Sequence, residues 1–210
     1  MVKILVADDH AVVRQGVKQI LADDFDDAVI GEASNIHEVL DLVRKRKWDI
    51  VILDMTMPGR SGLDALKDLK QLHPKLPVLV LSMHPEDQFA VRVFKAGAAG
   101  YLTKESAAEE LVTAIRKVLH GGKYISSSLA EVLATSLSDD LGNPPHLTLS
   151  DREYQILSLI ASGKTARNIA NELSLGVSTI STYRSRILQK LKMKNNAELT
   201  RYALQHQLVP

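Results

Sequence analysis

Carboxylates stand at the ends of two apolar runs in the first quarter of the chain. Ile50–Leu53 is followed directly by Asp54, and Val2–Ala7 is followed by Asp8 and Asp9. Short apolar runs rich in β-branched residues predict strands that are buried on both faces of a parallel sheet. The carboxyl ends of parallel strands meet at one edge, where open α/β sheets bind ligands. The sequence therefore predicts that the three carboxylates share one pocket.

A hydroxyl and an amine are placed in the same way further along the chain. The apolar run Pro77–Leu81 ends on Ser82, and Gly100–Thr103 is followed by Lys104. Three carboxylates in one pocket raise each other's pKa unless a cation neutralises them. Hard oxygen ligands that water can reach suit Mg²⁺. We therefore expect the acidic pocket to bind Mg²⁺.

These residue types can act together on a phosphoryl group. A carboxylate can attack phosphorus to form an aspartyl phosphate, while a divalent cation neutralises the developing charge. An ammonium and a hydroxyl can bind the remaining phosphoryl oxygens. Taken alone, a strand-end aspartate is usually a turn or helix cap, and a lone lysine is usually solvated. The placement of all five residues at strand ends favours the shared pocket.

Strand and helix patterns alternate strictly over residues 1–124. Apolar runs predict five strands, and apolar residues at helical spacing predict five helices between and after them. This order predicts an α/β fold, a doubly wound five-stranded parallel sheet. The expected strands are 2–7, 28–33, 50–54, 77–82 and 100–104, and the expected helices are 11–22, 36–46, 62–72, 86–96 and 107–119.

Residues 148–210 carry helical patterns and no convincing strand. Ser150 with Glu153 three residues later forms a capping box ahead of the first helix. A short helix from Thr165, a turn at 174–176, a longer helix from Ser178 and a last helix from residue 196 or 197 follow. We predict an all-α domain here. Residues 125–147, with a helix from the serines at 126–128 to about residue 137 and with Pro144 and Pro145, are the expected linker.

The two predicted domains also differ in net charge. After residue 145 there are nine lysines and arginines against four acidic residues, a net charge of +5, whereas residues 1–145 hold 17 basic and 21 acidic residues, a net charge of −4. The basic part indicates an anionic partner. The absence of cysteine, of a leader pattern and of an apolar run of about 20 residues leads us to expect a cytoplasmic protein without a membrane partner.

At these residues the first domain resembles a known family. Asp8-Asp9, Asp54 followed by Met57-Pro58-Gly59 and Gly62, and then Ser82 and Lys104, are similar to the receiver domain of two-component response regulators. The resemblance implies a flavodoxin-like or CheY-like fold whose central aspartate takes phosphate from a sensor histidine kinase. Such a receiver catalyses only its own phosphorylation and dephosphorylation, and is otherwise not an enzyme.

The resemblance also implies a role for each residue of the pocket. Asp54 is the phosphoacceptor, and Ser82 and Lys104 contact the phosphoryl group. Tyr101 is at the position of an aromatic switch, although by itself it is an ordinary half-buried strand tyrosine. The implied Mg²⁺ ligands are Asp9 as the principal ligand, Asp8 directly or through water, Asp54, and the backbone carbonyl of Thr56.

A few positions depart from the family's pattern or stay open. Glu105 replaces the proline that often follows the lysine. His10 follows the acidic pair and could look catalytic, but we interpret it as a helix-capping or exposed residue. Thr56 and His84 are at positions that border the phosphoryl group in the family.

The second domain resembles the LuxR-type helix-turn-helix DNA-binding domain. The similarity rests on the segments Leu149–Glu153, Ile160–Lys164, Ile169–Leu173, Ser178–Ile180 and Lys190–Leu191. Two domains in this order are typical of NarL/FixJ-type regulators, and the Thr-Tyr-Arg run at 182–184 looks most like the GacA/UvrY branch. Ser181 and Tyr183 replace a usual lysine and a usual histidine.

The resemblance implies that the helix from Ser178 enters a groove of double-stranded DNA. Alternatively, this helix shows only a solvated polar face on a small bundle; the +5 charge argues against that. Hydroxyl groups facing the groove read bases, and cations and hydroxyls contact phosphates. The expected groove-facing residues are Ser181, Thr182 and Ser185, and the expected backbone contacts are Lys164, Thr165, Thr179, Arg184, Arg186 and Lys190.

Further partners follow from the same resemblance. We expect a sensor histidine kinase, operator DNA, RNA polymerase and a second copy of the chain when it is phosphorylated or DNA-bound. Leu199 and Ala203 share a face of the last helix that suits dimerisation, unless that face packs on the helix beginning at Ser150. The alternative function is a Mg²⁺-dependent phosphohydrolase of the haloacid-dehalogenase type. That class needs Asp-x-Asp, and Thr56 stands at the second position.

Overall fold

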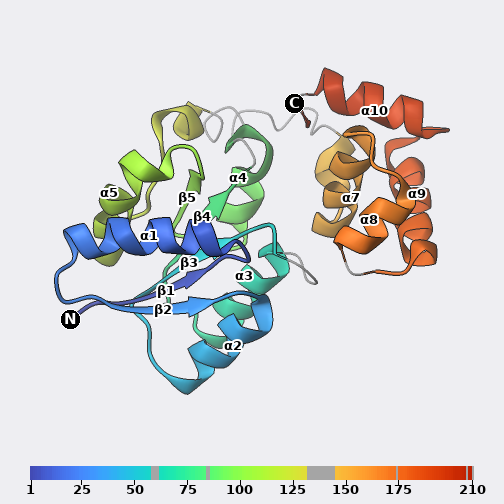
Figure 1. Ribbon diagram of the computed structural model, residues 1–210. Coiled ribbons are helices and arrows are strands. Elements are labelled where there is room, and N and C mark those ends of the chain that lie inside the picture. Colours follow the sequence, from blue (N-terminus) through green and yellow to red (C-terminus); the bar gives the residue numbers. More distant parts are fainter. Residues whose placement is uncertain (58–61, 84–85, 132–144, 174, 207, 210) are drawn as a thin grey trace. The chain divides into compact units, whose positions relative to one another are not determined.

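The computed structural model describes the 210-residue chain except for residues 58–61, 84–85, 132–144, 174, 207 and 210 (Figure 1). The chain divides into two compact units, Met1–Ser136 and Leu137–Pro210. In the described part of the chain, no helix combines the length and the apolar character that crossing a membrane requires.

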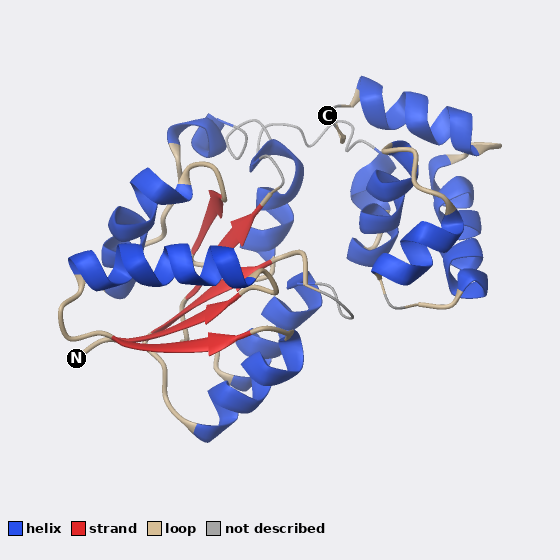
Figure 2. Cartoon of the chain, viewed as in Figure 1, coloured by secondary structure: helices blue, strands red, loops and turns tan. Residues whose placement is uncertain are grey.

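The first unit is built on a parallel sheet of five strands. These are β1 (Lys3–Ala7), β2 (Val29–Ala33), β3 (Ile50–Asp54), β4 (Val78–Ser82) and β5 (Gly100–Thr103), in the order β2-β1-β3-β4-β5. Each pair of neighbouring strands is parallel, and their arrows fan out in Figure 2 across the twisted sheet. Every residue of β3 and β4 is buried, as expected for strands covered on both faces. The predicted fold class is confirmed.

Five helices alternate with these strands. They are α1 (Ala11–Asp24), α2 (Ile36–Lys45), α3 (Gly62–Leu72), α4 (Glu86–Lys95) and α5 (Ala107–Leu119). Helix α1 packs against α5, and α2 packs against α3. The side chain of Asn35 caps α2 by accepting a hydrogen bond from the Glu38 N–H (3.0 Å), which fixes where this helix begins.

The core follows the period-two alternation of the strands. Ile4 and Val6 of β1 and Ile52 of β3 pack in one cluster with Leu21 of α1 and Ile115 of α5. The residues between them on each strand point to the opposite face, so both faces of the sheet are buried. This double burial makes the strands read as nearly continuous apolar runs in the sequence.

The strand register brings the polar strand ends together. Ala7 of β1 is paired with Leu53 of β3, so the next residues on these strands, Asp8 and Asp54, lie side by side. Ser82 of β4 is paired with Thr103 of β5, and the Lys104 N–H donates to the Ser82 carbonyl (2.8 Å). One edge of the sheet therefore carries all the predicted strand-end residues.

The segment after α5 continues the first unit. Tyr124 forms a bridge to Gly100 beside β5, and residues 127–131 are helical, with the Ser126 hydroxyl accepting from the Leu129 N–H (3.1 Å). Leu129 is fully buried. This segment is therefore more firmly packed than a linker would be. The rest of the expected linker helix and the expected break at 138–144 lie outside the described residues, and the linker bounds 125–147 stay a prediction.

The second unit is helical. It contains a short 3₁₀ turn η1 (Pro145–Thr148), α7 (Asp151–Ala161), α8 (Ala166–Glu172), α9 (Val177–Leu191) and α10 (Asn196–Gln205). Both hydrogen bonds of the capping box between Ser150 and Glu153 are present. Thr165 caps α8, and Asn195 caps α10. Helix α9 begins at Val177, one residue before the predicted start.

Our assignment of one face of α10 to a dimer interface is wrong. Leu199 and Ala203 are both fully buried inside the second unit, where α10 packs along α7. These side chains therefore belong to the core of the second unit. The large apolar side chain that α10 exposes is Leu204, which is 53% exposed.

These two leucines make a matched pair for a stability test. We expect Leu199→Ala to lower the free energy of unfolding by about 3 kcal/mol, because it leaves a cavity in the core. Leu204→Ala, on the same helix, should change it by less than about 0.5 kcal/mol. Urea unfolding followed by far-ultraviolet circular dichroism measures both. If the two variants lose similar amounts of unfolding free energy, Leu199 is not a core residue.

Candidate functional site

The ammonium of Lys104 lies between two buried carboxylates at the carboxyl edge of the sheet. Its Nζ is 2.7 Å from Asp8 Oδ2 and 3.0 Å from Asp54 Oδ2. The side chains of Asp8 and Asp54 are 2% and 0% exposed, and that of Lys104 is 9% exposed. The sequence predicted a cation among these acids as a bound metal. The protein itself supplies one.

The close contacts shift the pKa of both partners. Burial raises the pKa of Asp54, and the neighbouring Asp8 charge adds to this, while Lys104 and the Thr56 N–H act against it. Burial alone would lower the pKa of Lys104, but its contacts with Asp8 and Asp54 outweigh that effect and raise it. The lysine is therefore held charged, and Asp54 is a less acidic, more basic carboxylate than usual.

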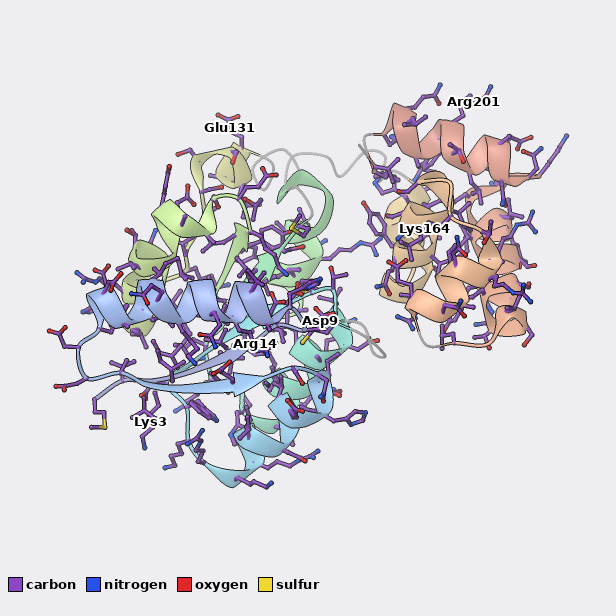
Figure 3. All side chains as sticks on the ribbon, viewed as in Figure 1. Lys3, Asp9, Arg14, Glu131, Lys164 and Arg201 are labelled. Carbon is purple, nitrogen blue, oxygen red and sulfur yellow. The ribbon has the colours of Figure 1, made fainter. Side chains whose placement is uncertain are left out.

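Asp9 completes the acidic cluster at the mouth of this pocket. Figure 3 shows Asp9 at the end of the sheet opposite Lys3, where the strands finish. Asp8, Asp9, His10 and Asp54 each offer a ligand atom within 4.8 Å of the others. The buried Asp9 Oδ1 has no well-aligned hydrogen bond among the described residues, and His10 Nδ1 lies 2.8 Å from it. An acidic group of this kind fits a hard divalent cation.

The remaining receiver positions surround the same edge. Ser82 and Tyr101 are fully buried on β4 and β5. The Thr56 N–H donates to Asp54 Oδ1 (3.1 Å), so the loop after β3 folds back over the carboxylate, and the Thr56 side chain is exposed. Pro58, Gly59 and His84 lie outside the described residues.

Glycine at position 62 allows the start of α3 to approach the backbone at Met55, directly after Asp54. Its N–H donates to the Met55 carbonyl (3.3 Å), and a Cβ there would lie 2.5 Å from Met55 Cα. No side chain larger than hydrogen fits without moving the backbone next to Asp54. The family motif at Gly62 therefore has a steric cause in this chain.

Arg14 was not among the predicted residues, yet it contacts the site. It donates from Nη1 to the Asp8 carbonyl (2.7 Å), and its Nε lies 3.3 Å from Glu32 Oε2. Lys18 also reaches Glu32 (2.6 Å), and this contact lowers the pKa of that carboxyl, with Arg14 adding to the effect. Arg14 lies one helical turn after His10, so the spacing to the acidic pair could have indicated it.

In the second unit, α9 carries its hydroxyl groups on one face. Ser181, Thr182 and Ser185 are exposed, and each donates to the carbonyl four residues earlier, at 3.1, 3.1 and 3.0 Å. These bonds orient the hydroxyl oxygens outward as acceptors. A shallow hollow of about 250 Å³ is lined by Ser178, Thr179, Thr182, Tyr183 and Arg186. Ser178 and Tyr183 were not among the predicted contacts.

The predicted basic contacts are partly engaged inside the unit. Lys164 pairs with Glu172 (2.5 Å), Arg184 bonds Asn196 (2.5 Å), and Lys190 pairs with Glu153 (2.6 Å). Burial alone would raise the pKa of Glu153, but Lys190 and the Ser150 N–H hold it below its usual value. Lys190 therefore ties α9 to the capping box as well as presenting charge.

Both halves of the chain match described families. The "Response regulator receiver domain" matches residues 4–116, and "Bacterial regulatory proteins, luxR family" matches residues 147–203. The chain is a two-component response regulator. It belongs to the NarL/FixJ type and, by its relatives, to the GacA/UvrY branch.

The regulator is similar over its whole length to known proteins. It is 40% identical to response regulator GacA of Pseudomonas aeruginosa over 210 residues, 100% of this chain and 98% of that one. It is 37% identical to response regulator UvrY of Escherichia coli over 209 residues, 99% of this chain and 96% of that one. No similarity supports the phosphohydrolase alternative.

A solved structure shares the architecture of the regulator. RcsB from Salmonella enterica serovar Typhimurium, bound to the rprA promoter in the presence of the phosphomimetic BeF₃⁻, is similar with a TM-score of 0.59. It is 25% identical and covers 96% of this chain and 98% of its own.

The contacts of Lys104 with the buried Asp8 and Asp54 lead to a prediction about stability. We expect Lys104→Met to lower the free energy of unfolding by about 3 kcal/mol without metal, because it leaves two buried carboxylates without their cation. Adding Asp54→Asn should recover part of this loss. Urea unfolding in EDTA, followed by fluorescence of the sole tryptophan, Trp48, measures it in the first unit. A double variant as unstable as Lys104→Met would mean that lysine packing dominates.

Proposed function

We propose that the regulator receives a phosphoryl group on Asp54 from a sensor histidine kinase, and that this phosphorylation controls its binding to double-stranded DNA. The observation that carries the proposal is the position of Asp54. It is a fully buried carboxylate at a strand end, it carries a raised pKa, and a lysine ammonium lies 3.0 Å away. The protein is a transcription regulator, and its only catalysis is its own phosphorylation and dephosphorylation.

Mg²⁺ fits the acidic cluster. Asp9, Asp8 and Asp54 would hold it, together with the backbone carbonyl of Thr56. When bound, Mg²⁺ supplies charge neutralisation at a phosphoryl oxygen and orients that group toward the carboxylate. The ligand atoms that Asp8, Asp9 and Asp54 offer lie within 4.8 Å of one another, and this convergence supports the assignment.

The chain's own residues then carry the transfer. One oxygen of Asp54 attacks phosphorus, and the bond between phosphorus and the kinase histidine breaks, with its electron pair returning to the imidazole. The Lys104 ammonium leaves Asp54 for a phosphoryl oxygen while it keeps its contact with Asp8. The Ser82 hydroxyl donates to another phosphoryl oxygen, and its movement is coupled to the buried ring of Tyr101.

The second unit binds operator DNA through α9. The outward hydroxyl oxygens of Ser181, Thr182 and Ser185 accept from base edges in the groove. Phosphate contacts come from the list predicted above, namely Lys164, Thr165, Thr179, Arg184, Arg186 and Lys190. The regulator acts in the cytoplasm, where it meets DNA and RNA polymerase, and binds two half-sites as a dimer.

A labelling experiment tests the phosphoacceptor. Acetyl phosphate with Mg²⁺ should add one phosphoryl group to the full chain, as seen by intact mass, and Asp54→Ala should remain unlabelled. As a matched control, Asp49→Ala, an exposed aspartate at the start of the same strand segment, should be labelled like the wild type. Equal labelling of Asp54→Ala would sink the assignment.

The corrected surface of α10 gives a test of dimerisation. Two duplexes are compared, one with two half-sites and one in which a half-site has been replaced by unrelated sequence. Leu204→Glu should lower the affinity for the first duplex on the order of tenfold more than it lowers the affinity for the second. The first duplex is one that the full chain selects from a random pool, and gel shift measures the affinity. Gln205→Glu adds the same charge at the neighbouring exposed position and should lose little. Equal losses on both duplexes would assign dimerisation to the receiver.

A further inference from the structure

A second cavity lies at the amino edge of the sheet, away from the acidic cluster. It has a volume of about 630 Å³ and is lined by residues that join α2 to β3 and α3 to β4. One of them, Asp49, accepts a hydrogen bond from the Lys3 N–H (2.7 Å), and Figure 3 shows Lys3 at the end of the sheet opposite Asp9. Cavities of roughly 300–1,000 Å³ are typical sites for small organic molecules. The proposed function gives this cavity no task.

The floor of the cavity is apolar and its rim is cationic. Trp48 and Leu76 are only 6% and 8% exposed, so they form the floor. Arg46, Lys47 and Lys75 line the same cavity and are exposed, so they form the rim. The cavity can therefore cover the apolar part of a ligand while cations contact an anionic group at its mouth.

The ring of Trp48 fixes the position of the Arg46 guanidinium. Arg46 Cζ lies 4.1 Å from the centre of that ring, and Trp48 Nε1 donates to the Leu42 carbonyl (3.2 Å). Gly31 of β2 makes room for both side chains, because a Cβ there would overlap Trp48 Cη2 and lie 2.9 Å from Arg46 Nη2. Stacking orients the planar guanidinium without using its N–H groups. These donors can therefore bind an anion with little loss of conformational freedom.

The three cations of the rim have no carboxylate within ion-pair distance among the described residues. Elsewhere in the first unit, exposed cations do find such partners, as Arg116 does with Asp24 (3.0 Å). The cavity is also basic in a part of the chain that is acidic, since residues 1–145 hold 17 basic and 21 acidic residues, a net charge of −4. An anionic ligand would supply the partner that these cations lack.

We infer that this cavity is a second ligand site of the regulator, and that it binds an organic anion with an apolar body of one or two rings. The apolar body packs on Trp48 and Leu76, while the Arg46 guanidinium and the Lys75 ammonium bind the carboxylate, sulfonate or phosphate group. The site is separate from the phosphoacceptor, because β3 begins beside the cavity at Ile50 and ends at Asp54. An inorganic anion lacks the apolar contact and a neutral aromatic molecule lacks the charge, so each binds more weakly.

Two fluorescent probes with the same rings separate the charge from the apolar contact. Anilinonaphthalene sulfonate carries an anionic group, and the neutral phenylnaphthylamine does not. The sulfonate should bind the full chain on the order of tenfold more tightly than the amine, and Arg46→Gln and Lys75→Gln should each remove most of that difference. Lys45→Gln removes an exposed charge one residue before Arg46 and outside the lining, and should behave as the wild type. Charge variants that keep the wild-type preference overturn the inference.

Nuclear magnetic resonance locates the bound probe. Trp48 is the sole tryptophan, so its indole N–H gives a single signal in the full chain. This signal should shift as the sulfonate is added, with the same affinity that fluorescence measures. An indole signal that stays in place at saturation puts the probe elsewhere and overturns the inference.

The acidic segment 23–27 of a second copy is the occupant that this inference excludes. It carries four aspartates around Phe25, so its charge would also suit the rim. In sedimentation velocity, Arg46→Gln and Lys75→Gln should show the same proportions of monomer and dimer as the wild type. Loss of a dimer in both variants but not in Lys45→Gln would assign the cavity to the partner copy instead.

Discussion

The contact of one lysine with two buried aspartates determines how this receiver is built. Asp8 and Asp54 are adjacent because their strands are adjacent and in register. Both carboxylates are buried, and burying an unpaired charge costs a large amount of free energy. The Lys104 ammonium neutralises these charges. It comes from the end of β5, which is separated from β3 by β4. The carboxyl edge of the sheet is therefore held by charge as well as by backbone hydrogen bonds. In the proposed phosphotransfer, the group that stabilises the resting pocket is also the group that moves to a phosphoryl oxygen.

Sequence reasoning found the sheet and the five strand-end residues because each rests on a simple periodicity. Buried parallel strands give apolar runs, and a polar residue directly after a run must lie at the sheet edge. What the sequence could not give is which oxygen of Asp8 faces Lys104 and which faces His10, since that depends on side-chain rotation. The spacing of Arg14 from the acidic pair could have indicated that it lies near the pocket, but not that it donates to the backbone carbonyl of Asp8, because no residue type marks a carbonyl.

The helical unit shows where pattern reading fails. Leu199 and Ala203 lie four apart, which correctly indicates a shared face, but spacing does not say whether the face meets the same chain or another. The decision depends on how much of α7 remains uncovered by the other helices. Similarly, Lys190 has the composition of a phosphate contact, while its ion pair with Glu153 became visible only when α7 and α9 were placed side by side. A charged residue on a binding helix can serve both purposes.

His10 shows how the start of a helix fixes the surroundings of a neighbouring pocket. Helix α1 begins at Ala11, so the N-cap residue His10 directly follows the acidic pair and lies beside both carboxylates. The backbone N–H of His10 donates to Asp8 Oδ1 (2.8 Å), and its Nδ1 lies 2.8 Å from Asp9 Oδ1. These contacts hold the connection between β1 and α1 against the pocket. The residues that form the acidic cluster and the residue that begins the helix therefore belong to one short segment, and a change in the helix start also changes the pocket.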